Sequence, residues 1–326
     1  MTSFQAPIIG RTRILEFGTW DLFETWNLEL GAFIALVMLV VFPAFSHDSP
    51  EHKINDISSQ IARSSNSPTL LIERALEHRE LGELADAAAD LKAAYQLDPK
   101  LTVALKELAL VQLADGKPDL AFASINATLT NASSPDLLMA RAEIQTARHD
   151  YSAALDDCDA AFRQPTANLE WYLLRAQLQR RLAHFHDCLA GLRDGVVKTG
   201  SAVLHEELID AMIDAQEYKP ALKKIERELA DSRCRSSWLI RRARIRLAFG
   251  QTKAAHRDLQ AALAELNPRI TPTAPDVSLI IDRGTAHALL GDISRAHDDL
   301  TLARTLSADP FSLWRLEQLI SSAPER

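Results

Sequence analysis

The residues whose types and spacing most directly suggest chemistry form a short run, His184-Phe185-His186-Asp187-Cys188. Imidazole, carboxylate and thiolate groups are the ligands that zinc and related metals take from proteins. The run lies where a turn is predicted to lead into a helix, so the histidines face solvent while Cys188 faces inward. Such a set does not converge on one tetrahedral ion. A metal-dependent enzyme or accessory subunit that uses His184, His186 and Asp187 is therefore the alternative hypothesis, not the first.

Two pairs of adjacent carboxylates, Glu206-Glu207 and Asp298-Asp299, are the other groups with catalytic potential. Neighbouring residues on a helix point about 100° apart, so neither pair forms a facing acid and base. The sequence also lacks the GxxxxGK[ST], GxSxG, HExxH and GxGxxG motifs. We therefore expect a protein that is not an enzyme and that needs no cofactor or metal.

Charge and cysteine content exclude further classes of protein. The net charge is −8 and the pI is about 5.7, with no long basic tract, so a nucleic-acid partner is not expected. Cys158, Cys188 and Cys234 are odd in number and form no CxxC motif, which excludes a disulfide framework or a zinc ribbon. Cys158 and Cys188 stand at positions that repeat along the chain and are otherwise apolar, so we expect them in the core.

The elements that position these residues follow from a pattern that recurs between Pro68 and Pro310 at steps of 33 or 34 residues, with a longer last step of 41. Its clearest copy is Ala87-x3-Leu91-x2-Ala94, and a small residue, Ala75, precedes that copy by twelve positions. The copies begin at Ala87, Ala121, Ala154, Cys188, Ala221, Ala255 and Ala296. A fixed period of this length with small residues in both halves is typical of stacked helix–turn–helix units.

The sequence thus predicts an all-α solenoid of about seven hairpins over residues 68–310. The hairpins begin near Pro68, Thr102, Pro135, Leu169, Ala202, Ser236 and Val277. Their internal turns are expected at Gly82, Gly116, Asp150, Ala183, Glu217, Gly250 and Gly291. A proline-rich surface loop over 267–276 separates the last two units, and an amphipathic helix over 311–326 is placed to cap the open apolar end.

This pattern resembles the tetratricopeptide repeat over about three-quarters of the chain. The first unit matches six positions of the family frame: Ala75, Gly82, Ala87, Leu91, Ala94 and Pro99. Gly195 and Glu228 depart from the frame, since each replaces its second alanine. The resemblance implies a right-handed superhelix whose concave groove binds proteins or peptides and is seldom catalytic.

One internal coupling links the two helices of a unit. The seventh position is arginine in five units (Arg74, Arg141, Arg175, Arg242 and Arg283), and the position sixteen residues later is aspartate in four of them (Asp90, Asp157, Asp258 and Asp299). These positions are equidistant from the turn, so they face each other and favour an ion pair within the unit over an arginine ladder for an anionic ligand. Arg175 has Gly191 at the matching place, and we expect this unpaired arginine to be available for binding.

In the family, particular positions of the first helix line the groove. Carried onto this sequence, these positions give the candidate partner-binding residues Glu143, Gln177, Arg180, Arg181, Glu206, Asp210, Asp214 and Arg244, and the unpaired Arg175 is added to them. This surface carries both signs of charge and few aromatic residues, which suits a polar extended or helical segment. The clamp by which some members bind chaperone tails is absent. The first hypothesis is thus a non-enzymatic scaffold that binds a protein or peptide.

The chain before the repeats divides into an N-terminal segment over 1–27, a transmembrane anchor or signal segment over 28–46 and a linker over 47–67. Leu30 to Ser46 carries no charge and is close to the shortest span of a bilayer. We expect an uncleaved anchor with the repeats exported to a periplasmic or extracellular space. A cleaved, secreted form, a buried soluble helix and a purely structural role in the cell envelope stay open as alternatives. In the linker, Ile54, Ile57 and Ile61 are spaced for a short amphipathic helix.

Overall fold

A computed structural model describes residues 49–64, 67–130, 134–164, 168–271, 273, 275–306 and 310–323. The chain divides into two compact units, 1–65 and 66–326. In the first unit, helix α2 (Pro50–Arg63) brings the partly exposed Ile54, Ile57 and Ile61 to one face, as their spacing predicts. The predicted N-terminal segment and the predicted anchor or signal segment at 28–46 lie outside the described residues. Among the residues that are described, no helix is both long enough and apolar enough to cross a bilayer.

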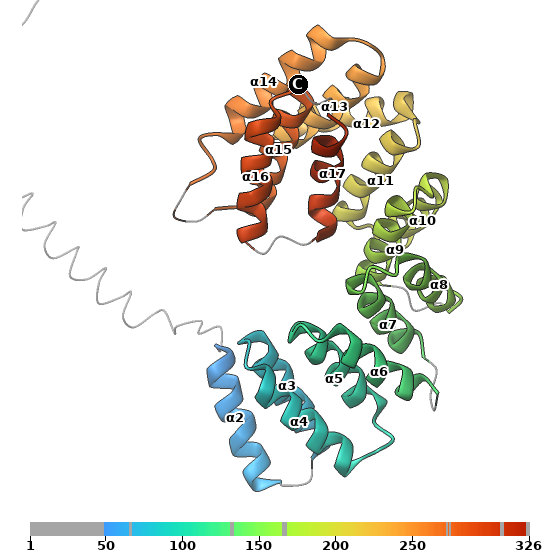
Figure 1. Ribbon diagram of the computed structural model, residues 1–326, viewed down its shortest axis with the longest axis vertical. Coiled ribbons are helices and arrows are strands. Elements are labelled where there is room, and N and C mark those ends of the chain that lie inside the picture. The colour runs from blue at the N-terminus through green and yellow to red at the C-terminus, as the bar shows by residue number, and fades with distance from the viewer. Residues whose placement is uncertain are drawn as a thin grey trace, which may run out of the picture. The chain divides into compact units, whose positions relative to one another are not determined.

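The second unit consists of helical hairpins followed by one more helix (Figure 1), and its described residues contain no strand. The hairpins pair α3 (Pro68–Glu80) with α4 (Leu84–Leu97), α5 (Thr102–Ala114) with α6 (Pro118–Leu129), α7 (Pro135–Ala147) with α8 (Tyr151–Ala161), α9 (Leu169–Arg181) with α10 (Phe185–Thr199), α11 (Ala202–Asp214) with α12 (Tyr218–Asp231), α13 (Ser236–Ala248) with α14 (Thr252–Leu266), and α15 (Val277–Leu290) with α16 (Ile293–Thr305). Helix α17 (Pro310–Ser321) follows. All seven predicted hairpin starts are confirmed.

Capping side chains explain where the first helix begins in several of the hairpins. The side chains of Ser67, Ser134 and Ser201 each accept a hydrogen bond from the backbone N–H three residues later. Such a cap satisfies one of the N–H groups that a helix start leaves unpaired. Pro68 and Pro135 occupy the first helical position, where proline has no N–H to leave unsatisfied.

Each turn inside a hairpin contains one residue in the left-handed conformation. In four hairpins this residue is glycine, whereas His149, Ala183 and Gln216 adopt φ values of 60–63° in the other three. In the third and fifth hairpins the left-handed residue thus lies one position before the predicted turn residues, Asp150 and Glu217. Each is the residue just before the next helix, and the side chain of Asp150 caps that helix. A side chain in this conformation costs roughly 1 kcal/mol, so these turns are held by the packing of the helices they join.

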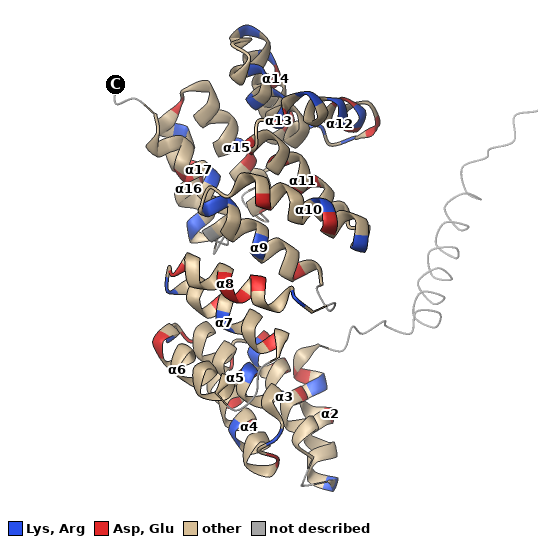
Figure 2. Cartoon of the chain, turned by 90° about the vertical axis from the view of Figure 1, so that its right-hand side faces the viewer, with Lys and Arg blue, Asp and Glu red and all other residues tan. Residues whose placement is uncertain are grey.

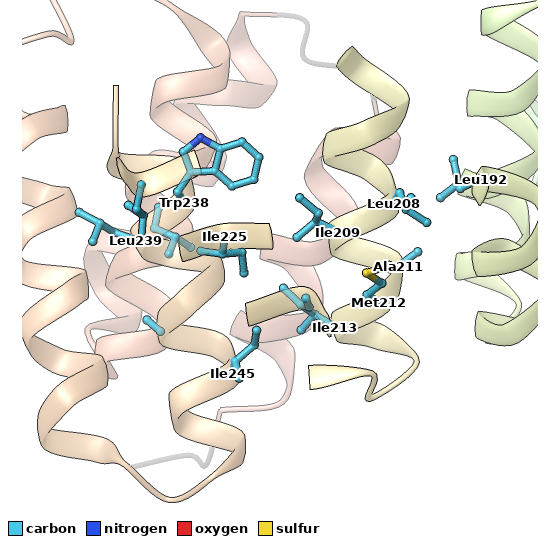
Figure 3. Packing of buried hydrophobic residues seen from close by; sticks show 14 of the residues in the cluster. Leu192, Leu208, Ile209, Ala211, Met212, Ile213, Ile225, Trp238, Leu239 and Ile245 are labelled. Atoms are coloured by element: carbon cyan, nitrogen blue, oxygen red, sulfur yellow. The ribbon is translucent and has the colours of Figure 1, made fainter. Parts of the chain in front are cut away.

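The repeated small residues are the contact points between helices. Ala87, Ala121, Ala154, Cys188, Ala221, Ala255 and Ala296 are all fully buried. Larger apolar side chains fill the space around them, as in the cluster of Leu208, Ile209, Ile225 and Trp238 (Figure 3). Gly195 departs from the alanine frame for a steric reason, because a Cβ there would lie 2.8 Å from the ring of Tyr172.

Helix α17 continues the array as a further first helix would. Its Leu313 and Leu316 are buried in one cluster with Ile280 of α15 and Leu300 of α16, which confirms that it covers the end of the last hairpin. Gly284 permits this contact, because a Cβ at that position would lie 2.8 Å from Leu316. The start of α17 reaches further, since Phe311 packs against the cluster formed by helices α7 to α9.

Candidate binding groove

The predicted ion pairs within hairpins are confirmed. Arg74, Arg141, Arg242 and Arg283 each donate from Nε and Nη2 to the aspartate sixteen residues later, at 2.6–3.1 Å. The aspartates are buried, whereas about a fifth of each arginine side chain is exposed. Bidentate pairing of this kind fixes both the distance and the register of two antiparallel helices. These arginines therefore have an internal role.

The expectation that Arg175 is unpaired is wrong. Its Nε donates to Asp159 of the preceding hairpin at 2.7 Å, and its guanidinium lies 4.8 Å from the ring centroid of Phe162. Gly191 lies beside this arginine, and a Cβ there would make an ordinary van der Waals contact with Nη1 at 3.5 Å. Arg175 thus pairs with an aspartate sixteen residues before it, on α8, and not with one sixteen residues after it. This ion pair joins two neighbouring hairpins.

Part of the predicted groove is a cluster of paired charges on the first helices of the later hairpins. Its cations are Arg180, Arg241, Arg244 and Arg315, and its anions are Glu206, Glu207, Asp210 and Asp214. Five of the candidate residues lie here, and Arg180 and Asp210 are each only 9% exposed. Figure 2 shows that both signs of charge occur along the array. Each charge in this cluster therefore forms an ion pair with another residue of the same chain.

Asp210 and Asp214 lie one turn apart on α11 and organise the cluster. Arg241 donates to Asp210 at 3.0 Å, and Arg244 bridges the two aspartates, contacting Asp210 and donating to Asp214 at 2.7 Å. Arg315 of α17 donates to both oxygens of Asp214 at 2.9 and 3.0 Å. The two carboxylates therefore connect α11 with α13 and α17.

Burial and the arginines oppose each other in setting the pKa values of these aspartates. Burial would raise the pKa of Asp210, but Arg241, Arg315 and Arg180 together outweigh burial and lower that pKa. At Asp214 burial prevails over Arg315 and Arg180, and the pKa is raised. Removal of one partner from a buried ion pair leaves the other charge desolvated and uncompensated, so each arginine matters to the fold.

The cluster borders a cavity of about 480 Å³. Its walls come from α9, α11, α13, α15 and α17, that is, from the first helices of successive hairpins and the last helix. Ile240, Ile281 and Trp314 supply apolar surface, while Ser237 and Ser278 supply hydroxyl groups. Most of its lining residues are polar or charged, and its concave shape and volume are within the range of ligand-binding pockets.

The other candidate residues lie elsewhere on the array. Glu143 is exposed on α7, and Gln177 is half-buried on α9. Arg181 extends over the ring of Tyr151, 4.5 Å from its centroid. These residues do not join the charge cluster, so the structure brings the predicted groove residues together only in part.

The run that suggested metal chemistry is divided by its helix. His184, His186 and Asp187 are exposed, whereas Cys188 is fully buried and its Sγ donates to the carbonyl oxygen of Ala176 at 3.5 Å. Burial raises the pKa of Cys188 to about 11 and that of Cys158 to about 12, consistent with the core role expected of both. The ligand atoms of this described run do not gather at one point, so the run does not support the alternative hypothesis of a metal-dependent function.

A different group of described residues does gather metal-binding atoms. One ligand atom from each of His78, Glu83 and Asp86 lies within 4.8 Å of the other two at the turn between α3 and α4. His78 Nδ1 is hydrogen-bonded to Glu83 at 2.6 Å, which accounts for the approach of these two side chains. Glu83 and Asp86 are exposed, so the group is explained by a surface contact around a turn.

Sequence reasoning missed Arg241, Asp282 and Arg315. Each is the sixth residue of its helix, as is Glu207 of α11. A signal was present, because the sixth position is charged in α3, α5, α11, α13, α15 and α17, whereas it is Ala140 in α7 and Leu174 in α9. A glutamate at the sixth position can also accept a hydrogen bond from an arginine of the preceding hairpin. Glu107 accepts one from Arg79 at 2.7 Å, and Glu207 accepts one from Arg180 at 3.0 Å.

Comparison with known proteins finds similarity in structure but none in sequence family. No protein-family model matches the sequence, and no curated protein matches it. A tetratricopeptide repeat protein from Parabacteroides merdae is similar in structure, with 18% identity and a TM-score of 0.56 over 78% of this chain and 99% of its own. A chain in the structure of the APC/C hetero-tetramer Cut9–Hcn1 shares 13% identity, with a TM-score of 0.51 over 81% of this chain and 52% of its own. PilF of Pseudomonas aeruginosa shares 17% identity, with a TM-score of 0.50 over 62% of this chain and 92% of its own.

A fold shared with a tetratricopeptide repeat protein agrees with the helical hairpins of this chain, their buried alanines and the repeat period of its sequence. At identities below 20% these similarities establish the architecture alone. The described repeats of this chain therefore have a tetratricopeptide-like fold.

Proposed function

We propose that this protein is a non-enzymatic scaffold that binds a segment of a protein partner along the first helices of its hairpins. The observation that carries the proposal is the cavity between α9, α11, α13, α15 and α17, a concave site in a fold whose relatives are repeat proteins. Its mixed lining of hydroxyl, charged and apolar groups favours a polar segment with a few apolar side chains over a purely apolar ligand.

The internal pairing of the cluster decides which substitutions test this function. Arg180 and Asp210 are unsuitable because their loss leaves buried charges without partners. Ser312 is exposed, lies on α17 and lines the cavity. Ser312→Arg should fill the mouth of the cavity without removing an arginine or an aspartate. Ser321→Arg, at the exposed end of the same helix, is the matched control.

The test is capture of partners by the full chain in cells, followed by cross-linking and mass spectrometry. Ser312→Arg should reduce the recovery of a cross-linked partner about tenfold, as expected when a side chain blocks the centre of an interface. Ser321→Arg should leave recovery unchanged. If a partner cross-links to the cavity-lining helices and Ser312→Arg captures it as well as the original chain does, binding at the cavity is refuted.

We further propose that residues 30–46 anchor the protein in a membrane with the repeats exported. The support is the uncharged run itself and the preceding Trp20 and Trp26, which suit a membrane interface. Alkaline carbonate extraction should leave the full chain in the membrane pellet and release a chain without residues 1–46. Protease added from outside should digest the repeats, and protection of the repeats would refute the orientation.

A further inference from the structure

Asp282 of α15 differs from the other carboxylates around the cavity. It is half-buried, lines the cavity, and forms no ion pair or hydrogen bond with any described residue. Burial raises its pKa to about 6, with Asp210, Glu206 and Asp276 adding to the rise and Arg241 opposing it. At pH 7 the group is therefore mostly ionised, and no cation within the described chain lies in contact with it.

The neighbouring arginines are already engaged. Arg241 contacts Asp210 and Glu206, Arg244 contacts Asp210 and Asp214, and Arg180 contacts Glu207 and Asp214. Arg315 is bidentate on Asp214. These four arginines and four carboxylates balance, so Asp282, which Arg241 influences without forming an ion pair, adds one net negative charge to the lining of the cavity. A ligand with a positive charge complements that charge, and an anion does not.

We propose that Asp282 receives the cationic side chain, lysine or arginine, of a partner segment bound in this cavity. The proposal rests on the proposed function and specifies the chemistry of its ligand. The lining fits such a side chain, since Val277 and Ile281 offer apolar surface for the methylene groups. Ser278 and Thr285 on the same helix offer hydroxyl oxygens as additional acceptors for its N–H groups.

Asp282→Asn is a favourable test variant because it removes the charge and keeps the shape. The uncompensated carboxylate opposes folding at neutral pH, so the variant should melt at a higher temperature than the original chain. A loss of binding in a stabilised protein cannot come from misfolding. Asp231→Asn, an exposed aspartate at the end of α12 and away from the cavity, is the matched control.

The experiment selects random dodecapeptides displayed on phage against the detergent-solubilised full chain and measures the affinity of synthetic copies by fluorescence anisotropy. The selected peptides should share a lysine or arginine. Asp282→Asn, or replacement of that basic residue by norleucine, should each weaken binding about tenfold or more, as for a close charge pair in an interface. The two losses should not add, which identifies a direct contact, and Asp231→Asn should bind normally.

Each other outcome is decisive. Peptides that bind the original chain and Asp282→Asn equally would overturn this inference while leaving a peptide-binding scaffold intact. Peptides that depend on acidic residues, or that lack basic ones, would likewise overturn it. A failure to select any peptide would count against both this inference and the proposed function.

Discussion

Arg315 and Asp214 are 101 residues apart in the sequence, yet two guanidinium nitrogens of Arg315 donate to the two carboxylate oxygens of Asp214 at 2.9 and 3.0 Å. The pair joins α17 to α11 and thereby spans two complete hairpins. Repeat arrays are held mainly by contacts between adjacent units. This contact is an exception, and it brings the last helix to the wall of the cavity.

Replacement of Arg315 by methionine should loosen α17. The change leaves Asp214 with less compensation for its burial, and we expect a loss of about 2 kcal/mol in the free energy of unfolding. Urea denaturation measures the loss, and hydrogen exchange should accelerate in α17 first. Arg304→Met is the control, because the Arg304–Glu317 pair also ties α17 but is exposed, so its loss should be below about 1 kcal/mol.

The pairs within hairpins should show coupling. Arg141→Leu strands the buried Asp157 and should destabilise the chain by about 3 kcal/mol, and Asp157→Leu should cost a similar amount. The double substitution should cost clearly less than the sum, because it removes both charges together. Strict additivity in urea denaturation would show that the two residues do not act as a pair.

Glycine should improve the strained turns. Ala183 has φ of 60°, so Ala183→Gly should raise the free energy of unfolding by about 0.5–1 kcal/mol. The same replacement at Ala190, exposed within α10, should lower it by about 1 kcal/mol. Opposite shifts in melting temperature are the expected result, and a fall for both variants would contradict a left-handed turn at Ala183.

Asp282 should make stability depend on pH. Its pKa rises from an ordinary 3.8 to about 6 on folding, so the folded chain binds this proton more tightly than the unfolded chain does. Stability from this group is complete below about pH 4 and is lost as the pH rises through 6. Asp282→Asn should therefore be more stable than the original chain at pH 7, by at most about 3 kcal/mol, and equally stable below pH 4.

Denaturation of both chains between pH 4 and pH 8 checks this prediction. The charged groups that act on Asp282 are Arg241, Asp210, Glu206 and Asp276, and Arg315 lines the same cavity. The difference between the two chains should grow with pH in the window around 6. A constant difference across that range would show that Asp282 does not titrate there.

Most of the fold follows from the local frame of the sequence. Helix starts, the buried alanines and the pairing of Arg141 with Asp157 depend on spacing within one hairpin, where the turn sets the geometry. The uncharged run at 30–46 is also evident from the sequence alone, and the membrane anchor it suggests stays a prediction.

Contacts between hairpins depend on tertiary structure. The pairing of Arg175 with Asp159 depends on how two neighbouring hairpins pack. The pairing of Arg315 with Asp214 and the position of Asp282 depend on how several hairpins stack along the array. No spacing within one repeat encodes these arrangements. The sequence by itself therefore determined the hairpins and the pairs inside them, whereas only the stacking of those hairpins decided which charges neutralise each other and which one is left facing the cavity.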